Sequence, residues 1–198
     1  RATADAVMAG ARTVDGHPVD LAPGGPEFRR RRMRNGLAEY NLRVVVSGSG
    51  SLNPNAAIFE TTFSPVIVIA SKSAPDRKLN RLRKQSAEVQ QFGETEIDFV
   101  AALRWLRKQH GVRRLLCEGG GELNDALFRA GLVDELHLTV CPLVFGGRSA
   151  STLCDGIGFE KLNDACELDL KSRKQIGAEQ FLVYRVRPRQ PGRSGHGG

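Results

Sequence analysis

Through residue 134 the hydrophobic positions fall into short apolar runs separated by polar or amphipathic stretches. Three runs of aliphatic residues occupy 5–10, 42–46 and 65–70, and a fourth covers 113–117. Short runs in which apolar residues follow one another, rather than alternate with polar ones, are typical of strands buried on both faces of a parallel sheet. A further short strand is predicted at 87–92.

The stretches between these runs predict helices and loops. Asp98 is a good N-cap for a helix that runs to about His110 and ends at Gly111. The segment 73–84 is predicted to be partly helical, and 28–37 is a short, very basic helix that ends at Asn35-Gly36. The stretch from Thr13 to Pro18 is predicted to be a loop after the first strand.

Beyond residue 131 the pattern changes from strand–helix alternation to a series of strands. Residues 132–140 alternate apolar and polar positions, and 168–176 and 181–186 predict a hairpin joined at Gly177-Ala178. We therefore expect an α/β fold whose sheet is mainly parallel, with antiparallel C-terminal strands at one edge. Residues 1–188 are expected to form a single domain, and the Gly/Arg-rich residues 189–198 a disordered tail.

Composition narrows the class of protein. The chain has 198 residues, 40% hydrophobic and 26% charged, as expected for one globular domain. It contains neither an apolar run of about 18 residues nor the apolar core of a signal peptide, so we expect a cytoplasmic protein without a membrane partner. The cysteines are widely spaced at 117, 141, 154 and 166, which predicts reduced thiols and no metal site. Cys117 and Cys141 lie in apolar runs and are expected to behave as small hydrophobic residues.

The net charge of +7 is concentrated partly in an arginine cluster, which we define as Arg29, Arg30, Arg31, Arg32 and Arg34. The cluster could be a solvated helix face, a clamp for a ligand phosphate or a nucleic-acid patch. Only Phe28 lies nearby, so base stacking on interleaved aromatic residues has little support. The sequence does not favour nucleic acid, and it leaves the other two interpretations open.

The most informative stretch is 113–134, RRLLCEGGGELNDALFRAGLVD. It predicts a buried strand, a run of three glycines and a helix with Leu123, Leu127 and Ala130 on one face. Glycines allow a ligand to approach the backbone, and a helix N-terminus presents free N–H groups with a partial positive charge. One glycine would be enough for a turn, so the run favours an anion site, most often a phosphate site, with Glu118 at its lip.

This stretch and its continuation to GLVDELHLTVCPLVFGG resemble the riboflavin-biosynthesis reductase domain, the C-terminal half of the bifunctional pyrimidine deaminase/reductase. ADAVMAGARTV, LRVVVSGSGSLNP and PVIVIAS fit the same family in the same order. The resemblance implies a dihydrofolate-reductase-like fold, NADPH as cofactor and a homodimer. It also implies reduction of the ribosylamino group of a 5-aminopyrimidine phosphate, such as 5-amino-6-(5-phosphoribosylamino)uracil, to a ribitylamino group by hydride transfer to ribose C1′.

The resemblance also assigns roles to residues of this chain. Cofactor contacts are implied for Thr13, Ser47, Gly48, Gly119, Gly120, Gly121, Glu122 and Leu123. Ser49 and Ser71 match the loops around the adenosine half less strongly. Glu118 is implied to bind the polar groups of the substrate. No catalytic side chain, covalent nucleophile or metal is identified.

Family members begin with a further strand that carries a Ser-Leu-Asp-Gly type of motif, and this sequence starts after that point. We expect this sequence to lack that strand, because the sheet would otherwise lose a central member. Two alternatives stay open. The same fold could reduce dihydrofolate or another pterin or pyrimidine, and the arginine cluster could make the chain a basic nucleic-acid-binding protein.

Overall fold

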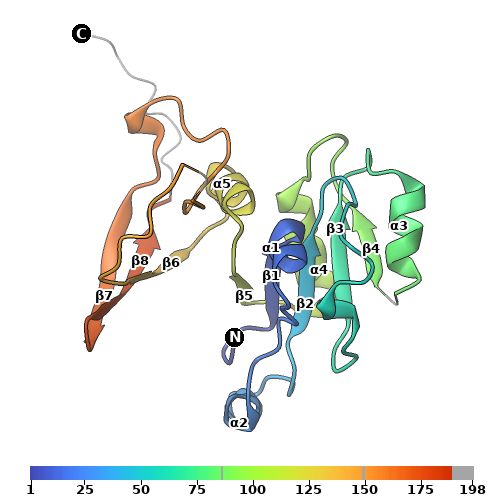
Figure 1. Cartoon of the computed structure of the whole chain (residues 1–198), viewed down its shortest axis with the longest axis horizontal. Coiled ribbons are helices and arrows are strands. Elements are labelled where there is room, and N and C mark those ends of the chain that lie inside the picture. Colours follow the sequence, from blue (N-terminus) through green and yellow to red (C-terminus); the bar gives the residue numbers. More distant parts are fainter. Residues whose placement is uncertain (86, 149, 189–198) are drawn as a thin grey trace.

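The structure is a computed structural model that describes residues 1–85, 87–148 and 150–188. Within these residues the chain builds a five-stranded parallel sheet in the order β4-β3-β2-β1-β5 (Figure 1). Its strands are β1 (Ala6–Gly10), β2 (Leu42–Val46), β3 (Val66–Ala70), β4 (Glu88–Gln91) and β5 (Leu115–Cys117). These strands confirm the predicted apolar runs and their parallel arrangement.

Helices cover both faces of this sheet because successive strand residues point to opposite sides. The helices involved are α1 (Ala11–Gly16), α3 (Asp76–Arg83), α4 (Phe99–His110) and α5 (Gly121–Arg129). One core joins Val7, Val45 and Val68 to α1 and α3. The other joins Met8 and neighbouring strand residues to α4 and α5. The continuous apolar strands therefore have the two-sided burial that their sequence predicts.

The basic helix α2 (Pro26–Arg34) stands apart from both cores, and the short turn η1 (Ala57–Phe59) precedes β3. Arg32 is the buried residue of α2, at 1% exposure. Its guanidinium donates to the carbonyls of Arg1, Ala4 and Ala38. Arg32 thus ties α2 to the segment that leads into β1.

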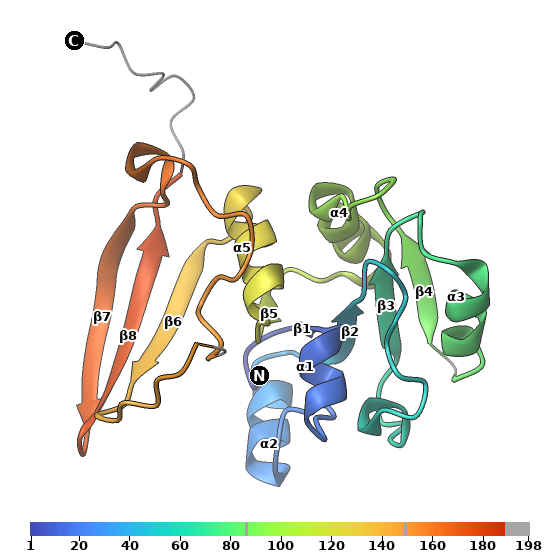
Figure 2. The ribbon, with the colours of Figure 1, turned by 45° about the horizontal axis from the view of Figure 1, so that its top comes forward.

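The C-terminal strands form a separate antiparallel sheet in the described residues, in the order β6-β8-β7 (Figure 2). They are β6 (Glu135–Val140), β7 (Leu168–Ile176) and β8 (Glu179–Val186), with the turn η2 (Leu162–Asp164) before β7. The hairpin at Gly177-Ala178 is confirmed, but its expected place at the edge of the main sheet is wrong. β5 ends one sheet and β6 ends the other, and no described strand pairs with both.

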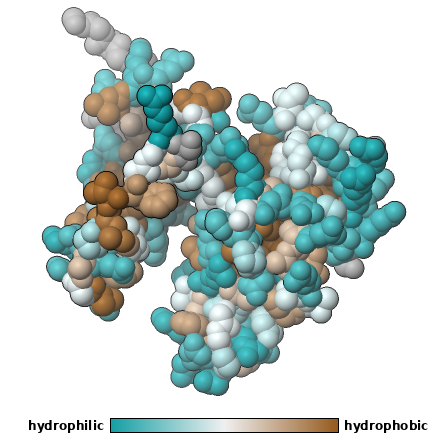
Figure 3. Space-filling view, viewed as in Figure 1, coloured by the Kyte–Doolittle hydropathy of each residue, from teal (hydrophilic) through white to brown (hydrophobic). Residues whose placement is uncertain are grey.

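The antiparallel sheet has no core of its own. Past Phe128, no described residue is buried. Large apolar side chains stand in solvent instead, among them Val144 at 100% and Phe145 at 97% exposure, and Figure 3 shows brown patches on this part of the molecule. Exposed apolar surface of this kind marks a contact site.

Two local predictions are wrong. The stretch after β1 is the helix α1 rather than a loop, with Val14 buried against the core. Cys141 lies just past the end of β6 and is exposed rather than packed, because no element covers the antiparallel sheet at this point in the described residues. The predicted disordered tail, 189–198, lies outside the described residues.

Candidate functional site

A cleft of about 1460 Å³ opens at the carboxyl ends of β1, β2 and β5. The chain runs outward from β1 to β2, β3 and β4, then returns to place β5 on the other side of β1. Such a reversal of strand order leaves a crevice above the carboxyl ends, because the flanking loops diverge there. The topology alone therefore makes this cleft the candidate site.

The residues predicted to contact the cofactor or the substrate line this one cleft, apart from the less strongly matched Ser71. They are Thr13, Ser47, Gly48, Glu118, Gly119, Gly120, Gly121, Glu122 and Leu123. Ser49, the less strongly matched position, lines it too. Ser71 is buried beneath the loop and donates to the carbonyl of Gly48. The structure thus brings together segments that are more than 100 residues apart in the sequence.

The first two glycines of the triple-glycine run have a conformational role. Gly119 and Gly120 have φ values of +86° and +61°, which side chains rarely allow. A Cβ on Gly120 would also lie 3.2 Å from Thr13 Oγ1. α5 begins next, without a side-chain cap, so the N–H groups of its first turn face the cleft as donors for an anion.

The third glycine makes room for another part of the chain. A Cβ on Gly121 would collide with the carboxylate of Asp155. Asp155 belongs to residues 151–158, which we call the strap. The Asn124 amide donates to the Leu153 carbonyl over 2.9 Å, and the Gly158 N–H donates to Asp125 Oδ1 over 3.0 Å. The strap is therefore fastened along α5 and forms one wall of the cleft.

Glu118 lies directly after β5, with its N–H donating to the Met8 carbonyl over 2.8 Å. Its two carboxylate oxygens each accept from the guanidinium of Arg1, both over 2.5 Å. Arg1 is held in turn by the Ala22 carbonyl. The hydrogen bonds to Glu118 raise the pKa of Arg1 above its usual value. The pair presents a fixed carboxylate at the lip of the cleft.

Hydroxyl groups gather beside β2, at the end of the cleft formed by the loop after that strand. Ser49 and Ser51 are joined by their hydroxyls over 2.8 Å, and the ammonium group of Lys78 donates to Ser51 over 2.7 Å. Both serines line the cleft. A lysine beside two hydroxyl groups is suited to binding a phosphate group.

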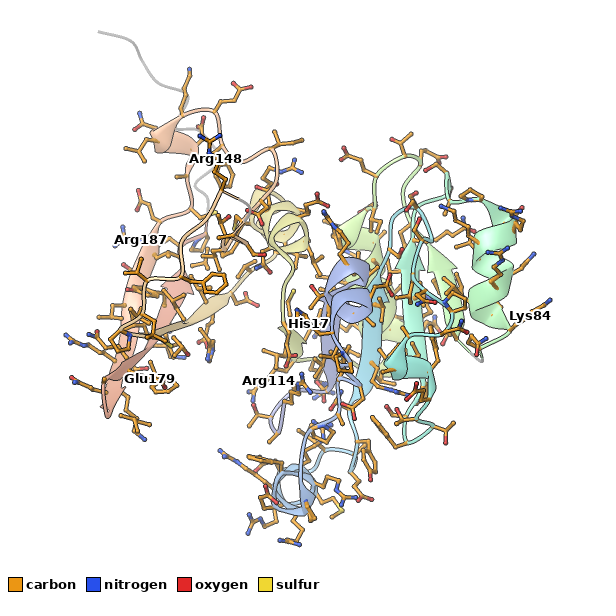
Figure 4. All side chains as sticks on the ribbon, in the orientation of Figure 1. His17, Lys84, Arg114, Arg148, Glu179 and Arg187 are labelled. Carbon is orange, nitrogen blue, oxygen red and sulfur yellow. The ribbon has the colours of Figure 1, made fainter. Side chains whose placement is uncertain are left out.

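The cleft has its own basic residues, and the arginine cluster does not line it. Arg12, in α1, pairs with Glu122, and this hydrogen bond, together with a smaller effect of Asp155, raises the pKa of Arg12. His17, which follows α1, also lines the cleft (Figure 4). In the cluster, Arg32 is structural, while Arg29 pairs with Glu39 and lies 5.4 Å from the centre of the Tyr40 ring. A clamp for a ligand in this cleft is therefore not its role.

Metal and thiol chemistry gain no support from the part of the chain that the structure describes. No group of three or more His, Cys, Asp or Glu side chains there could hold a metal ion. Burial raises the pKa of Cys117, whose thiol points to Asn124 Oδ1 over 3.7 Å, as for a packed, unreactive thiol. The same described residues contain no helix that is long and apolar enough to cross a bilayer.

The sequence did not identify Arg12, Asn124 or Asp155 as part of the site. Arg12 lies between the predicted first strand and the predicted loop, and Asp155 lies in a long connection without a periodic pattern. No local signal marks Asp155, because its contact with Gly121 forms only when 151–158 folds back onto α5. Asn124 could have been suspected, since it follows the glycine run by one helical turn.

The chain resembles several known proteins. Residues 1–182 match the family model described as the RibD C-terminal domain. The chain is 33% identical over 194 residues to the 2,5-diamino-6-ribosylamino-4(3H)-pyrimidinone 5′-phosphate reductase of Methanothermobacter thermautotrophicus, covering 94% of this chain and 82% of that protein. It is 37% identical over 161 residues to the protein of the same name from Archaeoglobus fulgidus, covering 81% and 72%.

Solved structures share the fold. A pyrimidine reductase-like protein from Corynebacterium diphtheriae superposes with a TM-score of 0.73 at 22% identity, covering 92% of this chain and 76% of that one. The predicted α/β class, dihydrofolate-reductase-like, with a mainly parallel sheet and antiparallel C-terminal strands, is confirmed.

Proposed function

This chain belongs to the RibD C-terminal domain family, and from that membership and the geometry of its cleft we propose that it is a reductase of riboflavin biosynthesis. The observation that carries the proposal is the meeting of Glu118, the glycine run and the β2 loop in one cleft. The proposed reaction reduces the ribosylamino group of a 5-aminopyrimidine phosphate to a ribitylamino group. The names of the relatives favour the 2,5-diamino-4(3H)-pyrimidinone as the ring. The uracil form is the alternative.

We propose NADPH as the cofactor, and the residues present fit it. The uncapped first turn of α5, with Gly119 and Gly120, offers backbone donors for a pyrophosphate. The hydroxyls of Ser49 and Ser51 with Lys78 offer a second anion position, for the 2′-phosphate. When bound, NADPH supplies the hydride. The protein's own contribution is to orient both ligands and exclude water between them.

Glu118 supports the substrate side of the proposal. Its carboxylate is an acceptor only, so it suits the amino groups of a diaminopyrimidine or the hydroxyls of an opened ribose. Arg1 holds both of its oxygens in place, so that little side-chain freedom is lost when substrate binds. A substrate donor could share these oxygens with Arg1 or replace one of its bonds.

The surroundings of the antiparallel sheet complete the proposal. Figures 1 and 2 both place β6 on the β5 side of the parallel sheet, and each of these end strands has an unpaired edge. We propose that a preceding strand of the protein joins them, and that a second copy covers the exposed apolar surface around Val144 and Phe145. A cytoplasmic location, which the free cysteines suit, is part of the same proposal.

Steady-state turnover tests the function. The diaminopyrimidinone and uracil ribosylamino phosphates and dihydrofolate should be offered in parallel with NADPH, following the loss of nicotinamide absorbance. We expect turnover with a ribosylamino phosphate and not with dihydrofolate. Glu118→Gln should lower kcat/KM by about 100-fold, because an amide cannot replace a charged acceptor at a site built for one.

Glu39→Gln is the matched control, since Glu39 is an exposed carboxylate outside the cleft. It should leave turnover unchanged. Reduction of dihydrofolate alone would replace the proposed substrate with a pterin. Unchanged kinetics in Glu118→Gln would remove Glu118 from the substrate site.

A further inference from the structure

The strap lies across the start of α5, where the Asp155 carboxylate packs against Gly121. We propose that residues 151–158 form a gate, in which the Asp155 carboxylate fills the anion position beside Gly121 and is displaced by the pyrophosphate of the dinucleotide. The inference rests on the proposed function for the identity of the ligand. It goes beyond that function because it makes cofactor entry depend on a movement of the strap.

The seat of Asp155 is specific. Its carboxylate lies against the backbone of Gly121, the first residue of α5, where any side chain would collide with it. The hydroxyl and the N–H of Thr152 both donate to the same carboxylate. The helix dipole favours a negative charge near the start of α5, and the described hydrogen bonds to this carboxylate come from Thr152, which leaves the N–H groups of α5 to a ligand. Two anions at one helix start repel each other, so they compete for the position.

The strap is anchored in a way that permits this part to move. Asp125, 3% exposed, accepts from the Gly158 N–H and from Arg129 Nε over 2.9 Å, and Gly156 packs directly on it. That end of the strap is held by a buried carboxylate. The Asp155 end lies in an exposed stretch, and the described residues join it to α5 by the side-chain hydrogen bond from Asn124 Nδ2 to Leu153 O. Asp155 can therefore move away from α5 while Gly158 keeps its hydrogen bond to Asp125. The hydrogen bond between Asn124 and Leu153 is either kept or lost in that movement.

Arg12 connects the gate to the ligand's charge. In the closed arrangement its guanidinium pairs with Glu122 and feels the negative charge of Asp155. Departure of Asp155 removes one of these two carboxylates from the surroundings of Arg12. An incoming pyrophosphate supplies a negative charge in place of Asp155, so Arg12 exchanges one counter-ion for another. The closed strap thus lowers the apparent affinity for the cofactor by the fraction of molecules that are closed.

Binding of two probes tests the gate. The Kd for NADPH is measured by nicotinamide fluorescence and the Kd for inorganic pyrophosphate by calorimetry, at one fixed salt concentration. In Asp155→Asn, which keeps the shape and removes the charge, both ligands should bind roughly fivefold more tightly. Glu160→Gln removes the same charge just beyond the strap, at an exposed residue outside the cleft, and should leave both Kd values unchanged.

Hydrogen exchange tests the movement itself in the unaltered chain. NADPH or pyrophosphate should increase amide exchange in peptides that cover 151–155, because the strap leaves α5. A wall that merely closes over the ligand would become more protected. Circular dichroism and thermal melting of each variant establish that the chain is folded before its Kd is compared.

The outcomes separate the two proposals. Tighter pyrophosphate binding by Asp155→Asn together with no NADPH binding by any variant would retain the gate and reject the nicotinamide cofactor. Equal or weaker binding of both probes by a folded Asp155→Asn protein overturns the gate. So does protection of 151–155 when ligand binds, or failure of the chain to bind either probe.

Discussion

The three glycines at the start of α5 are required for three different reasons. Gly119 and Gly120 adopt positive φ, and Gly120 also passes close to the Thr13 hydroxyl. Gly121 has an ordinary helical conformation, and it is glycine because Asp155 packs against it. The sequence predicted one phosphate cradle from all three. The structure divides them between a backbone donor site and the seat of the strap.

Arginine side chains usually lie at the surface, but Arg43, like Arg32, is buried. Arg43, in β2, is 1% exposed, and its guanidinium donates to the Ile58 carbonyl over 2.7 Å and to the backbone and side chains of Thr61 and Ser64. It also lies 4.3 Å from the centre of the Phe63 ring. Burial lowers the pKa of this guanidinium, but its donors are well supplied with acceptors. The arginine in the apolar strand is therefore structural.

Lys78 provides a test of cofactor choice at the scale of one residue. Lys78→Ala should raise KM for NADPH by about tenfold and leave KM for NADH unchanged, because only NADPH carries the 2′-phosphate that we propose the lysine binds. Steady-state kinetics with the two dinucleotides measure the ratio. Lys84→Ala, a lysine just past the other end of α3 (Figure 4), is the control and should change neither value. Equal losses for NADPH and NADH would place the 2′-phosphate elsewhere.

At the scale of elements, the helices that face the cleft begin differently. α4 starts with Asp98, whose Oδ1 accepts from the Ala101 N–H over 2.9 Å, and ends at Gly111 with φ +66°. α5 has no such cap. A capped helix keeps its donors for itself, whereas an uncapped one offers them to a ligand. This contrast supports the proposed anion site at α5 rather than at α4, although both helices line the same cleft.

The cap of α4 gives a prediction about stability. Asp98→Ala should lower the free energy of unfolding by about 1 kcal/mol, the usual cost of losing a side-chain N-cap. Urea denaturation followed by circular dichroism measures the change. Asp98→Asn keeps an oxygen acceptor and should lose much less. If the two variants were equally destabilised, the hydrogen bond to Ala101 would not be the cause.

The short helix α1 shows an element that the local sequence did not predict. Gly16, its last residue, and Pro18 indicate a loop, yet Val14 is buried in one core of the parallel sheet. Burial of that one side chain, together with the turn from β1, favours one and a half turns of helix over a loop. The consequence is functional, because α1 carries Arg12 and Thr13 to the cleft.

At the scale of the whole molecule, stability is unevenly distributed. The parallel sheet has cores on both faces, while the antiparallel sheet relies on its hydrogen bonds and on surface ion pairs such as those of Arg187 with Glu167 and Asp169 (Figure 4). Exposed ion pairs contribute little to stability. The exposed apolar residues on the connections of this three-stranded sheet are consistent with the proposed covering by a second copy.

The proposed second copy can be tested by mass in solution. Light scattering after size exclusion should give twice 21.6 kDa for the unaltered chain. The double change Val144→Glu with Phe145→Glu should weaken association by at least about tenfold, because it places charges in an apolar contact. Lys84→Glu, just past the end of α3, should leave the mass unchanged. A monomeric unaltered chain at high concentration would contradict the homodimer.

The arginine cluster also belongs to this scale, since it decides between an enzyme and a nucleic-acid-binding protein. Arg32 is buried and Arg29 is paired, so Arg30, Arg31 and Arg34 are the members of the cluster that remain exposed. The aromatic ring that Arg29 meets, Tyr40, is stacked on Phe63 rather than free for a base. These contacts favour the solvated helix face and weaken the nucleic-acid alternative.

The sequence by itself determined the parallel strands, most helix positions and the residues of the glycine run, because these depend on local pattern and on backbone conformation. It also gave the family, through motifs in a fixed order. Only the tertiary structure decided that Thr13, Ser47 and Glu118 share a cleft, since that follows from the reversal of strand order at β1. Asp155 at Gly121, Arg1 at Glu118 and the separation of the two sheets are contacts between distant segments, and no periodicity in the sequence encodes such contacts.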